Sequence, residues 1–141
     1  MSMITKFALG AASVSVFNTG DLRADMREWL GLTGAQLALA PALARPISVP
    51  VQNVHIALGD ASVLVDASRW HFADDAEYGI PGYTPPPDLP TQLAQAGIER
   101  ERITHVVLTH IHFDHVNGLL RDGALLFPQA LHYLGEGERA R

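Results

Sequence analysis

The decisive stretch of this sequence is Ile103–Leu108 (ITHVVL) followed directly by Thr109–Gly118 (THIHFDHVNG). The first six residues form a largely apolar run, which predicts a strand that is buried on both faces. Three histidines and one aspartate follow within six positions. Functional sites of α/β proteins gather where strands end. We therefore expect the segment after Leu108 to be the functional site.

The polar residues of this motif suit a metal ion. The chain has no cysteine, so a metal must be held by His, Asp or Glu, and neutral imidazole binds Zn²⁺, iron and Mn²⁺. His110 and His112 can reach one cation, and Asp114 and His115 can face a second beside it. Two such ions hold a bridging hydroxide, because zinc-bound water ionises at about pH 7. Asp114 is the expected proton carrier, and Thr109 is expected to hydrogen-bond beside the ligands.

Composition sets the broad class of the protein. The chain has 141 residues, of which 48% are hydrophobic and 18% charged, as expected of one globular domain. Its net charge of −5 argues against nucleic acid as a partner. No apolar run reaches the ~20 residues of a membrane span. The mildly apolar N-terminus lacks a cleavage site and is interpreted as a strand, so we predict a cytoplasmic protein without a membrane partner.

The rest of the pattern mixes hairpins with short helices, so the expected fold class is α/β or α+β. Loose alternation over 6–18 with an interruption at Gly10 predicts a hairpin or bulge, and 19–21 is interpreted as a turn. Asp25 is expected to cap a short helix, residues 34–44 favour a helix, and Pro46 and Pro50 are expected to break the chain. Further along, we expect strands over 51–58 and 62–67, helices over 88–96 and from 117 to 121, and short strands over 124–127 and 130–134.

A long loop is expected over residues 69–90. Trp70, His71, Tyr78 and Tyr83 lie in it and are candidates for substrate contact, because long loops often carry function. The alternatives are a solvated position for His71 and a role for the aromatic residues in anchoring the loop to the core. The other histidines outside the motif lie on expected strands and are interpreted as structural: His55, His105 and His132.

The motif and its surroundings resemble the metallo-β-lactamase superfamily. Residues 109–118 are similar to the HxHxDH signature of that family, residues 53–66 to its early strand pair, and residues 127–133 to the strand after the motif helix. The resemblance implies an αββα sandwich, usually two metal ions, most often zinc, and hydrolysis of an ester, lactone, thioester, amide or phosphoester. It also implies that Asp66 orients a ligand histidine. Similarity to the lactonase-like and glyoxalase-II-like branches favours a lactone or thioester as the small-molecule substrate.

The chain departs from the family pattern after the motif. The family places a histidine, a bridging aspartate and a last histidine downstream, whereas only 26 residues follow His115 and His132 is their single histidine. We therefore expect residues 1–141 to form the N-terminal half of the sandwich and to supply about half of a dinuclear site. The leading hypothesis is a metal-dependent hydrolase. The alternatives are a non-catalytic fragment or metal-binding subunit that needs a second chain or a homo-oligomer, and an iron-containing redox member of the fold.

Overall fold

The computed structural model describes residues 3–68 and 78–140. Its strands are β1 (Ile4–Leu9), β2 (Ala12–Ala24), β3 (Ile47–Leu58), β4 (Ala61–Val65), β5 (His105–Leu108), β6 (Leu120–Arg121), β7 (Ala124–Leu125) and β8 (Leu131–Leu134). Its α-helices are α1 (Met26–Trp29), α2 (Gly34–Leu39), α3 (Leu89–Gln95) and α4 (Phe113–Val116). Three 3-10 helices complete the described residues: η1 (Pro41–Ala44), η2 (Arg100–Arg102) and η3 (Glu136–Ala140).

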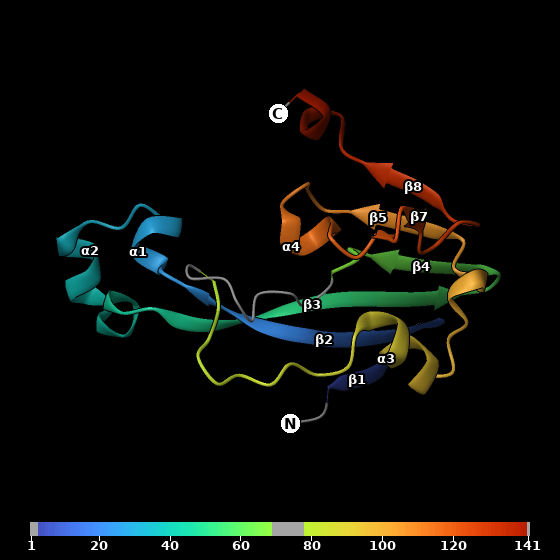
Figure 1. Ribbon diagram of the computed structural model, residues 1–141, viewed down its shortest axis with the longest axis horizontal. Coiled ribbons are helices and arrows are strands. Elements are labelled where there is room, and N and C mark those ends of the chain that lie inside the picture. Colours follow the sequence, from blue (N-terminus) through green and yellow to red (C-terminus); the bar gives the residue numbers. More distant parts are fainter. Residues whose placement is uncertain (1–2, 69–77, 141) are drawn as a thin grey trace.

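A six-stranded mixed sheet organises the fold, in the order β1-β2-β3-β4-β5-β8 (Figure 1). Strands β1 to β4 each pair antiparallel with the next strand along the chain, whereas β4, β5 and β8 run parallel. The connection from β4 to β5 carries α3, as a parallel crossover requires. The predicted mixed α/β class is thus confirmed, and β4 and β5 end at the same edge of the sheet.

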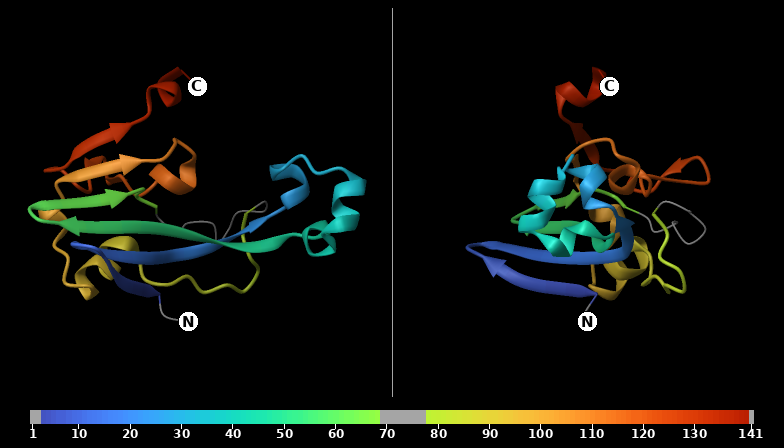
Figure 2. Two further views of the ribbon diagram at one scale, coloured as in Figure 1. Left: turned by 180° about the vertical axis from the view of Figure 1, so that it is seen from behind. Right: turned by 90° about the vertical axis from the view of Figure 1, so that its left-hand side faces the viewer.

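Strands β2 and β3 continue past the other strands as a long two-stranded arm that carries α1 and α2 at its far end (Figures 1 and 2). The side chain of Asp25 accepts a hydrogen bond from the Arg27 amide and so caps α1, as predicted. Thr33 and Gln36 form a reciprocal capping box at the start of α2. Among the described helices, none is long and apolar enough to cross a membrane.

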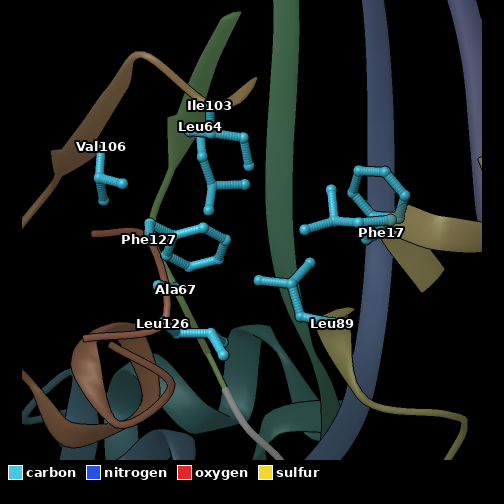
Figure 3. Packing of buried hydrophobic residues seen from close by; sticks show 9 residues of the cluster. Phe17, Leu64, Ala67, Leu89, Ile103, Val106, Leu126 and Phe127 are labelled. Atoms are coloured by element: carbon cyan, nitrogen blue, oxygen red, sulfur yellow. The ribbon is translucent and has the colours of Figure 1, made fainter. Parts of the chain in front are cut away.

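The main core lies between the sheet and α3. Leu89 and Leu93 of α3 pack toward Phe17, Leu64 and Val106 of the sheet, and the segment after β7 closes the cluster with Leu126 and Phe127 (Figure 3). All seven side chains are buried. Burial of a large apolar side chain stabilises the fold by about 1.5–3 kcal/mol, so this cluster holds α3 and the sheet together.

The opposite face of the sheet carries an apolar row that the described residues leave uncovered. The strand register aligns Val16, Val54, Val65, Val107 and Tyr133 across five neighbouring strands. None of the five is buried, and Val107 and Tyr133 are 36% and 48% exposed. We call this row the open face. The prediction that Ile103–Leu108 is buried on both faces is therefore wrong, because Ile103 and Val106 are buried in the core whereas Val107 is exposed on the open face.

Two predictions for the arm are also wrong. Residues 19–21 form no turn, because β2 continues to Ala24 and absorbs the irregularity as a bulge between Asn18 and Gly20. Pro50 lies inside β3 and does not break it. The pairing of β3 with β4 begins at Val54, so the preceding part of β3, which contains Pro50, is paired with β2 alone. A proline, which lacks an amide hydrogen, is tolerated there.

The prediction of a helix from 117 to 121 is wrong as well. Helix α4 ends at Val116, and Leu120–Arg121 pairs with Ala124–Leu125 as a small hairpin. Asp122 and Gly123 close that hairpin with positive φ values of 52° and 80°. An Asp-Gly pair in this conformation favours a two-residue hairpin turn over a helix.

Candidate metal centre

The parallel ends of β4 and β5 bring Asp66 and Thr109 into contact. The Thr109 amide donates to Oδ1 of Asp66 at 2.8 Å, and the Thr109 hydroxyl lies 3.0 and 2.9 Å from the two carboxylate oxygens. Asp66 is almost fully buried. A buried carboxylate needs such donors to offset its lost hydration. The contact therefore fixes the point at which the motif leaves the sheet.

His115 completes this arrangement from the other side. Its Nδ1 atom donates to Oδ2 of Asp66 at 2.8 Å, so Nε2 is the ring nitrogen left for a ligand. That Nε2 atom lies 3.5 Å from Oδ2 of Asp114. Two donors of one tetrahedral zinc ion, at bond lengths of about 2.1 Å, stand roughly 3.4 Å apart. The spacing of this donor pair therefore fits a shared cation.

The other two motif histidines gather around the same point. The ring centroid of His110 lies 4.0 Å from that of His115 and 4.5 Å from that of His112. The residue types suit zinc, since imidazole and carboxylate are among its usual ligands. Within residues 3–68 and 78–140, however, no group of three or more such side chains is arranged to hold one ion. The motif thus supplies suitable donors and one well-spaced pair, but not a closed ligand set.

The segment from Asp66 to Ser68 supports the motif through its backbone. The Ala67 amide donates to the His115 carbonyl at 2.9 Å, and the Gly118 amide donates to the Ala67 carbonyl at 2.7 Å. Asp66 itself has a φ of 59°, in the left-handed region that glycine, asparagine and aspartate adopt more readily than other residues. The surrounding hydrogen bonds hold it there. In this position the Asp66 carboxylate meets Thr109 and His115.

An open pocket of about 570 Å³ lies over the motif. One side carries the polar side chains of the motif, and the other side is apolar and aromatic. Its lining consists of Leu22, Trp29, Tyr78, His110, His112, Phe113, Asp114 and His115. The ring of Tyr78 also packs against Phe113, with centroids 5.3 Å apart. The arm and the loop before α3 therefore contribute an apolar wall beside the candidate metal ligands.

The structure separates the four loop residues that the sequence proposes for substrate contact. Tyr78 lines the pocket. Tyr83 instead donates its hydroxyl to Oδ2 of Asp21 at 2.9 Å and anchors the loop to β2. Burial and the Asp21 contact raise the pKa of Tyr83 to about 12. Trp70 and His71 lie outside the described residues.

The other histidines occupy different places. The buried His55 ring lies 2.8 Å from the Ser62 hydroxyl, and burial, with Lys6 nearby, lowers its pKa. His105 contacts the Thr104 hydroxyl and stacks on Tyr133, while His132 is exposed on β8. His55 and His105 line a larger hollow of about 740 Å³ at the starting ends of β4 and β5. Because the motif follows the opposite ends of these strands, the smaller pocket is the relevant one.

Several residues of the site were not predicted from the sequence. Leu22 and Trp29 belong to the arm and line the pocket although they are far from the motif in the sequence. Asn53 is buried beneath the site and accepts a hydrogen bond from the Ser68 amide. Gly118 stands at the end of the motif, and this position was the only feature of the sequence that linked it to the site.

Comparison with protein families gives a match that spans the motif. The family model described as "Metallo-beta-lactamase superfamily" matches residues 49–121, just over half of the chain. That range contains Asn53, Asp66 and the whole motif. A comparison with curated proteins found no match.

Solved structures show the same fold. The dizinc quorum-quenching lactonase AidC matches with a TM-score of 0.72 at 19% identity, over 97% of this chain and 46% of that one. A probable metal-dependent hydrolase from Staphylococcus aureus matches with a TM-score of 0.74 at 21% identity, over 95% and 50%. The hydrolase AbOPH matches with a TM-score of 0.67 at 15% identity, over 99% and 47%. The chain thus spans about half the length of these structures.

Proposed function

The chain belongs to the metallo-beta-lactamase superfamily. On this premise we propose that it acts as a metal-dependent hydrolase on a lactone, thioester or related ester. The observation that carries the proposal is the pocket over the motif, in which three imidazoles and one carboxylate face an apolar wall. A polar reaction centre beside an apolar wall suits a small ester with a hydrocarbon substituent. AidC, with the same fold, is a lactonase solved with N-hexanoyl-homoserine product, which supports this substrate class.

We assign the ligands by position within the motif. His110 and His112 would hold one zinc ion, and Asp114 and His115 a second. Bound there, the ions would supply Lewis acidity and a nucleophile from water at neutral pH. The ligand set of the described residues is open, so the complete site needs donors beyond those grouped here. Iron or manganese are the other metals that these ligands accept.

The residues of this chain have distinct tasks in the proposed reaction. Asp66 holds the Nδ1 proton of His115, which fixes the tautomer and leaves Nε2 as the donor atom. Asp114 lies beside that atom, and in this proposal it would pass a proton to the leaving group. Trp29, Tyr78 and Leu22 exclude water from one side of the pocket and orient the apolar part of the substrate.

A second candidate function follows from the open face. An apolar row across five strands with exposed members, together with an open ligand set, suits a metal-binding subunit that another chain completes. The accessible surface of 8734 Å² also exceeds the roughly 7,100 Å² typical of a monomer of this mass. The partner would cover the open face and add ligands.

One experiment tests the proposal and separates the two candidates. Zinc binding and turnover of a lactone, thioester and phosphoester panel are measured on the 141-residue chain, on H110A/H112A and on H132A, which removes an exposed histidine outside the motif. The hydrolase proposal expects zinc binding and turnover that the double variant loses and H132A keeps. Zinc binding without turnover favours the subunit. Absence of zinc binding, or equal loss in H132A, contradicts both.

A further inference from the structure

We propose that Asn53 and Gly118 are positioning residues that set the orientation of His115, by fixing the segment 66–68 between them. The meaning of this orientation for metal binding rests on the proposed function. The coupling itself is a property of the fold and can be measured on metal-free protein.

Gly118 meets the segment from the side of the motif. A Cβ atom at this position would lie 2.6 Å from the Ala67 carbonyl oxygen and 3.0 Å from the carbonyl carbon and oxygen of Ser68. These are backbone atoms, so no side-chain rotation can relieve the contact. Gly118 is not among the glycines with positive φ. Its requirement is therefore space, which lets the end of α4 rest directly on the segment.

Asn53 holds the same segment from the side of the sheet. Its side chain is fully buried on β3, and its Oδ1 atom accepts from the Ser68 amide at 2.8 Å. Its Nδ2 group donates to the Thr19 hydroxyl at 3.1 Å, and that hydroxyl donates to the Val51 carbonyl at 3.2 Å. A buried amide is costly unless it is hydrogen-bonded. This chain of bonds ties the residue two positions after Asp66 to the centre of the sheet.

The geometry shows why His115 would respond. Ordinary contact of a Cβ atom begins at 3.4 Å, so a methyl group on Gly118 must move the motif and the segment apart by about 0.8 Å. The bond from His115 Nδ1 to Asp66 is 2.8 Å long and joins the same two parts of the chain, so the displacement is expected to stretch or misalign it, and such a bond is lost at about 3.6 Å. Loss of the hydrogen bond between Asn53 and the Ser68 amide frees the segment from the sheet and is expected to weaken the bond between His115 and Asp66 as well. In both cases Asp66 stops fixing the tautomer of His115.

The test observes the imidazole nitrogens of His115 by ¹⁵N NMR in metal-free protein. Wild-type His115 is expected in the Nδ1–H tautomer. G118A and N53L are expected to lose that preference and show mixed tautomers. The matched control is G135A, because Gly135 has no positive φ and open space around it. This variant is expected to keep the wild-type signal.

Two further variants separate positioning from general destabilisation. T19V removes the far partner of Asn53 but leaves the Asn53–Ser68 bond, and N53D retains an acceptor for the Ser68 amide. Both are expected to keep the Nδ1–H tautomer, so the N53L and N53D pair decides the question even if G118A does not fold. A wild-type tautomer in folded N53L, or an equal change in T19V, overturns the proposal. A failure of zinc binding in the wild type leaves this readout intact and counts against the proposed function alone.

Discussion

The carboxylate of Asp66 and the imidazole of His115 stand 49 positions apart in the sequence, yet their Oδ2 and Nδ1 atoms lie 2.8 Å apart. They meet because β4 and β5 are parallel neighbours whose ends share one edge of the sheet. The same carboxylate also accepts from the Thr109 amide and hydroxyl. One acidic side chain therefore ties the first residue of the motif to the last of its candidate ligands.

Replacement of Asp66 by asparagine is expected to weaken zinc binding by 10–100-fold, the usual cost of losing such an outer contact. Asparagine tolerates the left-handed backbone of this position. Its amide group, however, would donate toward Nδ1 of His115 and move the ring proton to the ligand atom. Zinc titration against a competing chelator measures the effect. D60N, in the exposed turn between β3 and β4, is the control, and equal affinities in D66N and the wild type would contradict the assigned role.

Stability is expected to fall with acid because of His55. Burial, with Lys6 nearby, lowers the pKa of this histidine below the 6.5 of an unfolded chain. Between these two pKa values the unfolded state binds more protons than the folded state. The contribution of His55 to the free energy of unfolding is therefore fully present above about pH 6.5 and is lost as the pH falls through the folded pKa. One group changes the free energy of unfolding by at most about 1.4 kcal/mol per pH unit. Urea unfolding between pH 5 and 8 should show a flatter profile for H55Q than for the wild type; parallel profiles would exclude His55 as the cause.

Removal of the Tyr83 hydroxyl is expected to destabilise the protein by about 0.5–1.5 kcal/mol, because Asp21 loses a hydrogen-bond donor. Ultraviolet titration of the phenols gives a second readout. Since the pKa of Tyr83 is raised to about 12, Y83F should lack the component that ionises at the highest pH. If that component persists in Y83F, the Tyr83–Asp21 contact does not form in solution.

The core and the arm should respond very differently to truncation of leucine. Leu64 is 0% exposed within the main core, and Leu39 is 88% exposed on α2. L64A is expected to cost about 2–5 kcal/mol through lost burial and a residual cavity. L39A should stay within about 0.5 kcal/mol of the wild type. Denaturant unfolding measures both, and similar losses would mean that the arm packs against something in solution.

Trp29 is expected to affect the use of substrates with apolar groups. It lines the pocket from the arm, so W29A should lower kcat/KM for a long-chain acyl lactone about tenfold, equivalent to roughly 1.4 kcal/mol of lost contact. Short-chain substrates should change less. L39A, from the same arm but outside the pocket, serves as the control, and a uniform loss over all chain lengths would argue against a substrate contact.

Much of the local structure could be predicted from short-range patterns. The strand pair over 51–58 and 62–67, the Asp25 cap of α1 and the strand before the motif all follow from periodicity and capping signals that act within a few residues. The predictions that failed depend on distant partners. Residues 19–21 stay extended because β3 pairs with them, and Val107 is exposed because no described element covers its side of the sheet.

By itself, the sequence determined the mixed α/β class, the family of the chain and the position of the motif after a strand. These properties reside in residue types and their spacing along the chain. Only the tertiary structure decided that Leu22 and Trp29 wall the pocket and that Asn53 and Gly118 clamp the segment after Asp66. Those contacts join residues far apart in sequence, and hydrogen-bond lengths and the space for one methyl group depend on how strands and helix pack together.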